Sequence, residues 1–297
     1  MSRLTWEDLP EPVRDRVQAG TGQVVKTEPA ARSGLMPGLT ARLHLLDGSS
    51  RFLKAIRSSH EAVRLNWAEE WVNRVLPATM PSPALLWHSN GDGWHLMVFE
   101  YVNDHARHAD LSPGSPDLHA VLDTLALMQG LLTPCPRGAL PIARNLAPLH
   151  RKARHLLDSE QVNDLDLYLA AIGRFCDDDL DGDTLIHYDL NPGNLLVSRG
   201  RVNVLDWSFG CRGAAWVESA LFAPRLVQAG HTPAGVDELL TTIPGWSEAP
   251  RDAVAGLAAL WTLFRTYKAL HGPQEHRPAR AAAASAGHAW LLHVAAR

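Results

Sequence analysis

The stretch LIHYDLNPGNLLVSRGRVNVLDW, residues 185–207, places four polar side chains among strand-forming residues: His187, Asp189, Asn194 and Asp206. The runs LLVS and VNVLDW flank the turn sequence SRGR, so the stretch predicts a β-hairpin that returns Asp206 toward Asn194. An amide oxygen and a carboxylate would then converge, and hard oxygen ligands of this kind suit Mg²⁺. Asp189 lies in the loop before the hairpin, close to that metal site but free to accept a proton.

Composition and charge restrict the class of protein to which this stretch belongs. The chain has 297 residues, of which 46% are hydrophobic and 20% charged, as in a soluble globular protein with two substructures or one large domain. The formal net charge of -4 gives no indication of a nucleic-acid or anionic-membrane partner, although a mildly acidic face could attract a cationic ligand.

Cysteine usage and hydropathy indicate the compartment. The three cysteines lie far apart without a CxxC pair, which argues against a disulfide framework and against a thiolate zinc site. The longest strongly apolar run, residues 253–264, is too short to span a membrane. We therefore expect a cytoplasmic protein.

The first hundred residues predict a small antiparallel sheet with one helix. Short strand-like runs surround the turn sequences DG at 47–48 and GDG at 91–93, and each turn predicts a hairpin. Between the hairpins, Ser58 and Glu61 have the spacing of a capping box. A helical stripe follows and ends at Leu76-Pro77; its apolar residues are Leu65, Ala68, Val72, Val75 and Leu76. Five strands and one helix are expected here.

From about residue 104 the periodicity becomes helical. A helix is predicted after Ser115-Pro116, and further helices are predicted over roughly 145–158, 160–175, 216–229, 250–271 and 279–296. The chain is therefore expected to be an α+β protein of two lobes, a sheet lobe over residues 1–102 and a larger, mainly helical lobe over residues 103–297. Clefts between such lobes commonly hold ligands.

The opening stretch resembles the catalytic loop of the protein-kinase-like superfamily, H-x-D-x-x-x-x-N followed by a strand-borne Asp. HYDLNPGNLLV resembles the aminoglycoside phosphotransferase and choline kinase branch more closely than protein kinases, which generally have Lys where this chain has Asn191. DWS also replaces the DFG triplet. The resemblance covers most of residues 20–222 and implies a bilobal protein-kinase-like fold. One departure is Glu218, where the family usually has Asp, so its supporting role stays open.

The resemblance implies a role for each polar residue of the stretch. Asp189 would orient and deprotonate an acceptor hydroxyl, with His187 as a scaffold for the loop. Asn194 and Asp206 would hold Mg²⁺. Asn194 is therefore both a catalytic-loop residue and a metal ligand in this interpretation.

In the sheet lobe, the resemblance implies that Lys54 holds the α- and β-phosphates of the nucleotide and that an acid orients Lys54. Glu69 is the preferred acid because it lies nearest the buried stripe of its helix, whereas Glu61 belongs to the capping box. Glu70 is turned a further ~100° around the helix and is expected to point away from that face.

Two further nucleotide contacts are expected. The segment FEYV is the implied hinge, where the backbone of Glu100 and Val102 would bond the nucleobase edge; the alternative is a simple linker between lobes. The implied nucleotide loop, EPAARSGLMPGLT, has Ser33, Gly34 and Gly38 but no true GxGxxG, and it is equally consistent with an ordinary hairpin turn.

These residues predict a small-molecule O-kinase that uses ATP or GTP with Mg²⁺ and phosphorylates a hydroxyl of an antibiotic or related natural product. The alternatives are a metabolite kinase of the choline, thiosugar or amino-alcohol type and a non-catalytic nucleotide-binding module. Asp237, Glu238 and Glu248 lie where aminoglycoside kinases gather acids against polycationic sugars, so a cationic acceptor is one expectation, although exposed helix acids look similar. The oligomeric state is left open.

Overall fold

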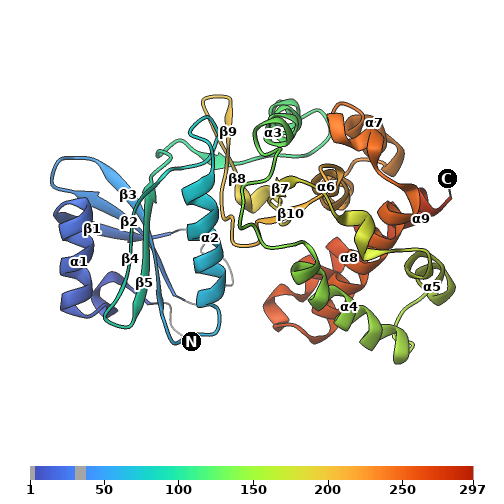
Figure 1. Cartoon of the computed structure of the whole chain (residues 1–297), viewed down its shortest axis with the longest axis horizontal. Helices are drawn as coiled ribbons and strands as arrows, with labels where there is room; N and C mark the ends of the chain where they lie inside the picture. The colour runs from blue at the N-terminus through green and yellow to red at the C-terminus, as the bar shows by residue number, and fades with distance from the viewer. Residues whose placement is uncertain (1–3, 31–37, 297) are drawn as a thin grey trace. The chain divides into compact units, whose positions relative to one another are not determined.

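The computed structural model describes residues 4–30 and 38–296, which form two compact units (Figure 1). We call them the sheet unit, Met1–Ala106 with Asn203–Phe209, and the helical unit, Arg107–Val202 with Gly210–Arg297. From the sequence, we expected one division of the chain, after residue 102. A single linear boundary cannot express that the sheet unit also takes in a second, distant segment.

The sheet unit contains a five-stranded antiparallel sheet with the strand order β1-β2-β3-β5-β4. Its elements are β1 (Val24–Pro29), β2 (Leu39–Leu45), β3 (Ser50–Arg57), β4 (Leu85–Gly91), β5 (Trp94–Glu100), α1 (Glu11–Thr21), α2 (Val63–Val75) and the 3-10 turn η1 (Trp6–Asp8). Both predicted hairpins are present. In the first turn Asp47 Oδ1 accepts the Ser49 N–H at 2.8 Å, and Gly48 has a φ of +82°, which glycine adopts without strain.

The two faces of the sheet carry different helices, and α1 and α2 lie on opposite sides of it (Figure 1). Successive side chains of a strand point to opposite faces. Val13 and Val17 of α1 therefore pack with one set of strand residues, among them Leu53 and Leu96. Lys54, the next residue along β3, is left on the side of α2.

The helix α1 adds to the single helix predicted for this part of the chain. Its sequence EPVRDRVQAGT is mostly polar, and Val13 and Val17 are its buried residues. Two apolar residues four positions apart make too weak a periodic signal to predict a helix. The burial of both valines against the sheet stabilises it instead, at about 1.5–3 kcal/mol for each side chain.

The predicted start of α2 is wrong. Residues 58–62 form turns, in which the His60 N–H bonds the Arg57 carbonyl, and the helix begins at Val63 with Ala62 as its N-cap. Ser58 and Glu61 therefore make no capping box. Of the predicted apolar stripe, Val72 is buried, whereas the helix also buries polar side chains: Asn66, Glu69 and Glu70.

The helical unit contains seven α-helices in the part of the chain that is described. They are α3 (Asp117–Leu131), α4 (Ala143–Asp158), α5 (Leu165–Gly173), α6 (Trp216–Gln228), α7 (Pro233–Leu240), α8 (Arg251–His271) and α9 (Arg277–Ala295). Short 3-10 turns are η2 (Asp177–Leu180), η3 (Pro192–Asn194), η4 (Pro244–Glu248) and η5 (Gln274–His276). The helix α7 was not predicted from the sequence, because its eight residues are too few for a clear period.

The helix α8 is the centre of this unit, since it packs against α4, α5, α6 and α9. Its residues from Ala253 to Leu263 are buried, so the longest apolar run of the sequence is a core helix. Between residues 4 and 296, apart from the gap at 31–37, none of the helices has both the length and the apolar character to cross a membrane.

Short strands position the loop residues of the opening stretch. They are β6 (Arg107–His108), β7 (Thr184–Ile186), β8 (Leu195–Ser198), β9 (Arg201–Val204) and β10 (Cys211–Gly213). They form a two-stranded sheet, β10-β7, and a three-stranded sheet, β6-β8-β9. The predicted hairpin is thus β8–β9, which turns at Arg199 and Gly200, both with positive φ. The strand β9 begins in the helical unit and ends in the sheet unit.

Candidate active site

Lys54 of β3 and Glu69 of α2 form a buried ion pair. The Lys54 ammonium donates to both carboxylate oxygens of Glu69, at 2.6 and 2.8 Å, and Glu69 is 2% exposed. The structure therefore places Lys54 with the acid that the sequence analysis selected. A charge-assisted pair with two hydrogen bonds holds the ammonium in one position.

Asp206 joins this pair within the sheet unit. Its Oδ1 lies 3.5 Å from Lys54 Nζ and accepts a hydrogen bond of 2.6 Å from the Ser208 hydroxyl. Asp206 has a φ of +62°, a left-handed conformation that non-glycine residues adopt at a cost and that clusters at functional sites. The side chain is 39% exposed, so solvent or a ligand can reach it.

Burial and the charges of the three residues shift the pKa values of Glu69 and Lys54. Burial raises the pKa of Glu69 to about 7, against the opposing effect of the Lys54 ammonium. Burial lowers the pKa of Lys54, but the carboxylates of Asp206 and Glu69 outweigh it and the net shift is upward. Lys54 is therefore a fixed positive charge at neutral pH.

Glu70 is buried, although the sequence analysis expected it to point away from the buried face of its helix. It is 8% exposed, and its carboxylate lies 3.0 Å from His88 Nδ1 on β4 and 3.7 Å from His95 Nε2 on β5. The rotation around α2 moves Glu70 away from Lys54, as expected. Because α2 lies flat on the sheet, however, the next position around the helix is buried as well.

The predicted hinge borders a pocket in the sheet unit with a volume of about 360 Å³. Its lining residues are Ser50, Arg51, Ser82, Pro83, Glu100, Tyr101, Val102 and Asn203. The Glu100 N–H bonds the Ala84 carbonyl at 3.0 Å, and the Glu100 carboxylate accepts the Ala84 N–H at 3.1 Å. The N–H of Glu100 is thus committed to the protein, so Glu100 could offer its carbonyl oxygen, and not its N–H, to the predicted nucleobase contact.

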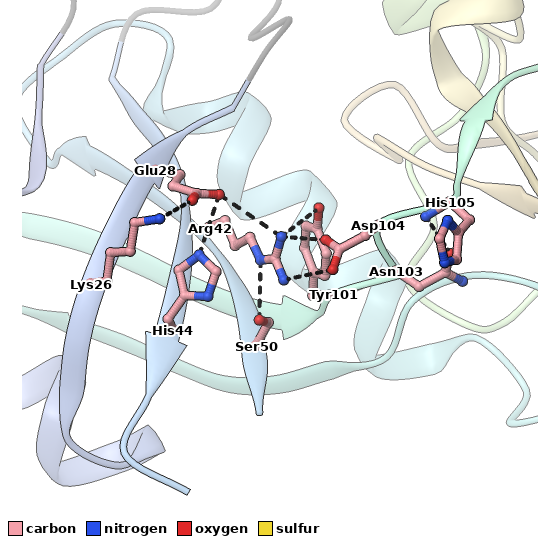
Figure 2. Close-up of polar contacts among 9 residues, drawn as sticks. All are labelled: Lys26, Glu28, Arg42, His44, Ser50, Tyr101, Asn103, Asp104 and His105. Carbon is pink, nitrogen blue, oxygen red and sulfur yellow. Dashed lines mark hydrogen bonds and ion pairs between the residues drawn. The ribbon is translucent and has the colours of Figure 1, made fainter. Parts of the chain in front are cut away.

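A polar network surrounds Arg42 of β2 beside the hinge (Figure 2). The Arg42 guanidinium forms an ion pair with Asp104, lies 4.2 Å above the Tyr101 ring and donates to Ser50 at 3.1 Å. It also lies 3.8 Å from Glu28 of β1. Arg42 thus ties the second strand to the segment after β5. Nothing in the sequence analysis indicated this network.

The predicted nucleotide loop is described only at its end. Ser33 and Gly34 lie outside the described residues. Gly38 has a φ of +127°, and a Cβ at this position would lie 2.5 Å from the Ala55 carbonyl oxygen. Gly38 is therefore needed where the chain passes close to β3.

In the helical unit, Glu218 of α6 holds the loop that carries Asp189. Its buried Oε2 accepts the backbone N–H of His187 and, at 3.2 Å, that of Tyr188. Burial raises the pKa of Glu218. His187 is fully buried, and its Nδ1 accepts the Asp189 N–H at 3.3 Å. His187 thus contacts the loop backbone, the position expected for a scaffold, and Glu218 fills the role that the sequence left open.

Two amide side chains fix the other side of the same loop. Asn191 Nδ2 and Asn194 Nδ2 both donate to the Asp189 backbone carbonyl, at 2.8 and 2.9 Å. The Asp189 carboxylate is 35% exposed. The structure thus brings Asp189 and Asn194 together in the helical unit, and Lys54, Glu69 and Asp206 together in the sheet unit.

The comparison with protein families matches residues 38–257, more than half of the chain, to the phosphotransferase enzyme family. The chain belongs to this family. It is a small-molecule phosphotransferase with an alcohol group as its acceptor. A comparison with curated proteins finds no match.

Solved structures share the fold of this phosphotransferase. A choline kinase from Streptococcus pneumoniae is 16% identical with a TM-score of 0.61, over 97% of this chain and 99% of that chain. The gentamicin complex of APH(2")-IIa is 14% identical with a TM-score of 0.59, over 98% and 99%. An amicoumacin kinase in complex with AMP-PNP and Ca²⁺ is 10% identical with a TM-score of 0.56, over 94% and 93%. The bilobal kinase-like fold expected from the sequence is therefore confirmed.

Two arginines of this phosphotransferase that the sequence analysis did not select contact Asp189. Arg225 of α6 and Arg265 of α8 each place a guanidinium nitrogen 3.6 Å from Asp189 Oδ1. In the sequence both look like ordinary basic helix residues, and no motif distinguishes them. Only the packing of α6 beside α8 brings them to one carboxylate.

Of the three acids expected to meet a cationic acceptor, Asp237 is buried and the other two, Glu238 and Glu248, are exposed. Asp237 accepts the Trp246 indole N–H at 3.2 Å and lies 3.7 Å from His293 Nε2. Asp237 therefore joins α7 to neighbouring elements of the phosphotransferase.

Proposed function

We propose that the chain transfers the γ-phosphate of ATP or GTP to a hydroxyl of a small natural product, with Mg²⁺ as the metal. The observation that carries the proposal is the buried Lys54–Glu69 ion pair with Asp206 beside it. A fixed ammonium next to an accessible carboxylate is the arrangement needed to bind nucleotide phosphates and their metal ion.

In this proposal the sheet unit binds the nucleotide. Lys54, oriented by Glu69, holds the α- and β-phosphates. The hinge backbone at Glu100 and Val102 would contact the nucleobase, and Ser33 and Gly34, which lie outside the described residues, are further proposed nucleotide-binding residues. Support comes from the pocket beside the hinge and from the amicoumacin kinase, which shares the fold and was solved with AMP-PNP.

Asn194 and Asp206 are the proposed ligands of Mg²⁺, and their chemistry fits that ion. Asp206 supplies a half-exposed carboxylate. The Asn194 amide nitrogen is held by the Asp189 carbonyl, which directs its amide oxygen elsewhere, and no contact of that oxygen is seen among the described residues. Oxygen ligands together with substrate phosphates are the preferred environment of Mg²⁺. When bound, the ion neutralises charge on the phosphates.

Asp189 is the proposed general base. Its carboxylate accepts the proton of the acceptor hydroxyl as the hydroxyl oxygen forms a bond to the γ-phosphorus. The bond between that phosphorus and the oxygen that bridges to the β-phosphate breaks, and its electron pair leaves with the nucleoside diphosphate. Glu218, His187 and Asn194 hold the loop, so the carboxylate is placed before the acceptor binds.

The test is nucleotide consumption against a panel of aminoglycosides, peptide and nucleoside antibiotics, choline and sugar alcohols. Asp189→Ala should lower kcat by about 10²- to 10⁴-fold, the usual contribution of a general base, with nucleotide affinity retained. Asp166→Ala, at an exposed position of α5, is the matched control and should behave as the wild type.

The same panel separates the alternatives. Turnover of choline or another amino alcohol, but of no antibiotic, would identify a metabolite kinase. Tight nucleotide binding without turnover of any acceptor would mean that the proposed catalytic function is wrong and that the chain is a nucleotide-binding module.

A further inference from the structure

Arg225 and Arg265 flank Asp189 and share one aromatic surface. Both guanidinium groups lie over the Trp261 ring, at 5.0 and 4.8 Å from its centroid, and both are 3.6 Å from the same carboxylate oxygen. Two like charges are therefore held close together beside the residue that faces the acceptor hydroxyl.

Neither guanidinium is fully satisfied by the protein. The side chains of Arg225 and Arg265 are only 12% and 21% exposed, and the Nε atom of each is buried without a hydrogen-bond partner among the described residues. Burial lowers the pKa of Arg225 to about 9, and the neighbouring charge of Arg265 acts in the same direction. Buried charges normally find partners, so this pair indicates a missing one.

Further cations lie near Arg265. Lys268 of α8 and Arg280 of α9 act on Arg265 or on each other as like charges, and Lys152 of α4 is close to Lys268. Burial, followed by these neighbours, lowers the pKa of both lysines. Among the ion pairs of the described residues, Asp189 is the one carboxylate that contacts any of the five.

Such a cluster of like charges destabilises the folded protein, so we looked for a functional reason for it. Stacking on Trp261 offsets part of the repulsion, but an apolar pair at these positions would serve the core better. An anion bound beside the accessible edges of the two guanidinium groups would offset their positive charge, and arginine is suited to carboxylate and phosphate groups.

We propose that Arg225 and Arg265 bind an anionic group of the acceptor, a carboxylate or a phosphate ester. The substrate would then be an anionic alcohol and not the cationic one expected from the sequence. This inference rests on the proposed function, because it takes Asp189 as the residue that faces the acceptor hydroxyl.

The first test measures anion binding without nucleotide. Inorganic phosphate should raise the melting temperature of the wild type at constant ionic strength, and Arg225→Gln and Arg265→Gln should each weaken phosphate binding by about tenfold or more. Arg137→Gln, at an exposed position, is the matched control. Without phosphate, each Gln variant should melt no lower than the wild type, since a repulsion is removed. Equal phosphate binding by all four proteins would overturn the proposal.

The second test compares acceptors that differ in charge: glycerol, glycerate, glycerol 3-phosphate and choline. The wild type should use an anionic probe at least about tenfold better in kcat/KM than glycerol, and both Gln variants should lose that preference through a higher KM. A preference for choline would contradict the proposal. So would an equal fall of kcat for every acceptor, because the arginines would then serve the transferred phosphoryl group.

The two tests distinguish the two levels of inference. If no probe is phosphorylated, phosphate binding in the first test still decides whether the arginines form an anion site. If phosphate binds as expected but Asp189→Ala turns over acceptors like the wild type, the proposed function fails and the anion site stands.

Discussion

At the residue scale, Glu218 stabilises the loop that carries Asp189. Its buried carboxylate accepts the backbone N–H groups of His187 and Tyr188, and Tyr188 has a φ of +73°. That left-handed conformation costs of order 1–3 kcal/mol, which the hydrogen bonds to Glu218 offset. Strain at this point places the neighbouring Asp189 carboxylate before any substrate binds.

Glu69 should give the protein a measurable pH dependence of stability. Its pKa rises on folding from 4.5 to about 7, so the native state binds more protons than the unfolded state between these values. Its contribution to stability is therefore present below pH 4.5, falls as pH rises toward 7, and is constant above that.

Melting temperatures of the wild type and Glu69→Gln measured from pH 5 to 8 check this prediction. The difference, wild type minus variant, should decrease with rising pH up to about 7 and then level off. Glu61→Gln, at an exposed site before the same helix, should run parallel to the wild type. A difference between wild type and Glu69→Gln that stays constant over the whole range would contradict the assignment.

The sequence could identify some of these residues and not others for a physical reason. Asp189, Asn194 and Asp206 belong to one short stretch whose spacing depends on local turn and hairpin geometry. Lys54 and Glu69 could be paired because strand and helix periods limit the choice. Arg225 and Arg265 lie forty residues apart on helices that give no local signal, and their meaning depends on packing that no period encodes.

At the element scale, the contact of α8 with α9 supports Trp261 and therefore the two arginines. A Cβ at Gly287 of α9 would lie 2.4 Å from Thr262 Oγ1 and 2.9 Å from the Trp261 side chain, closer than real contacts allow. The absence of a side chain at Gly287 is thus what permits this close approach of the two helices.

Gly287→Val should lower the free energy of unfolding by about 1–3 kcal/mol, because the valine overpacks this contact. It should also reduce phosphate binding, since Trp261 must move beneath Arg225 and Arg265. Gly130→Ala on α3 is the control: nothing lies within 4 Å of its added Cβ, and alanine favours a helix by about 0.5–1 kcal/mol. A Gly287→Val protein with unchanged melting temperature and phosphate affinity would contradict this interpretation.

Helices and hairpins were predicted correctly where the apolar residues recur with a clear period. They were predicted wrongly where tertiary packing decides whether, or where, a helix forms. The two hairpins of the sheet unit and the long helices α4, α8 and α9 follow their apolar periods closely. The start of α2 did not, because a capping-box spacing at Ser58 and Glu61 competes with turns that begin at the end of β3. Likewise α1 exists because the sheet covers its two valines.

At the scale of the whole molecule, the net charge and the charges near Asp189 favour ligands of opposite sign. The chain has a formal charge of -4, which by itself suits a cationic ligand, yet the two side chains that form ion pairs with Asp189, Arg225 and Arg265, are cationic. Summed charge describes the average surface and says little about one buried site. This is why the composition led to the expectation of a cationic acceptor.

Nucleotide and metal should stabilise the whole protein together. A ligand at 100 times its Kd adds about 2.7 kcal/mol to the stability of the native state, which corresponds to several degrees in melting temperature. MgATP should produce such a shift, and chelation of the metal should reduce it. Asp206→Asn should lose the metal-dependent part of the shift, whereas Asp166→Asn should keep it. The same shift in Asp206→Asn and the wild type would remove Asp206 from the proposed metal site.

The path of the chain from β9 onward affects any attempt to divide the protein into two fragments. The backbone enters the sheet unit at Asn203, leaves it at Phe209, and in between supplies Asp206, the Val204 N–H that bonds Pro81 and the Trp207 indole that bonds Ser82. An N-terminal fragment cut anywhere near residue 106 would lack all three. In a protein assembled from two fragments, the C-terminal fragment would have to supply Asn203–Phe209 to the sheet unit. A split-protein reporter divided near residue 106 should therefore work only when both fragments fold together.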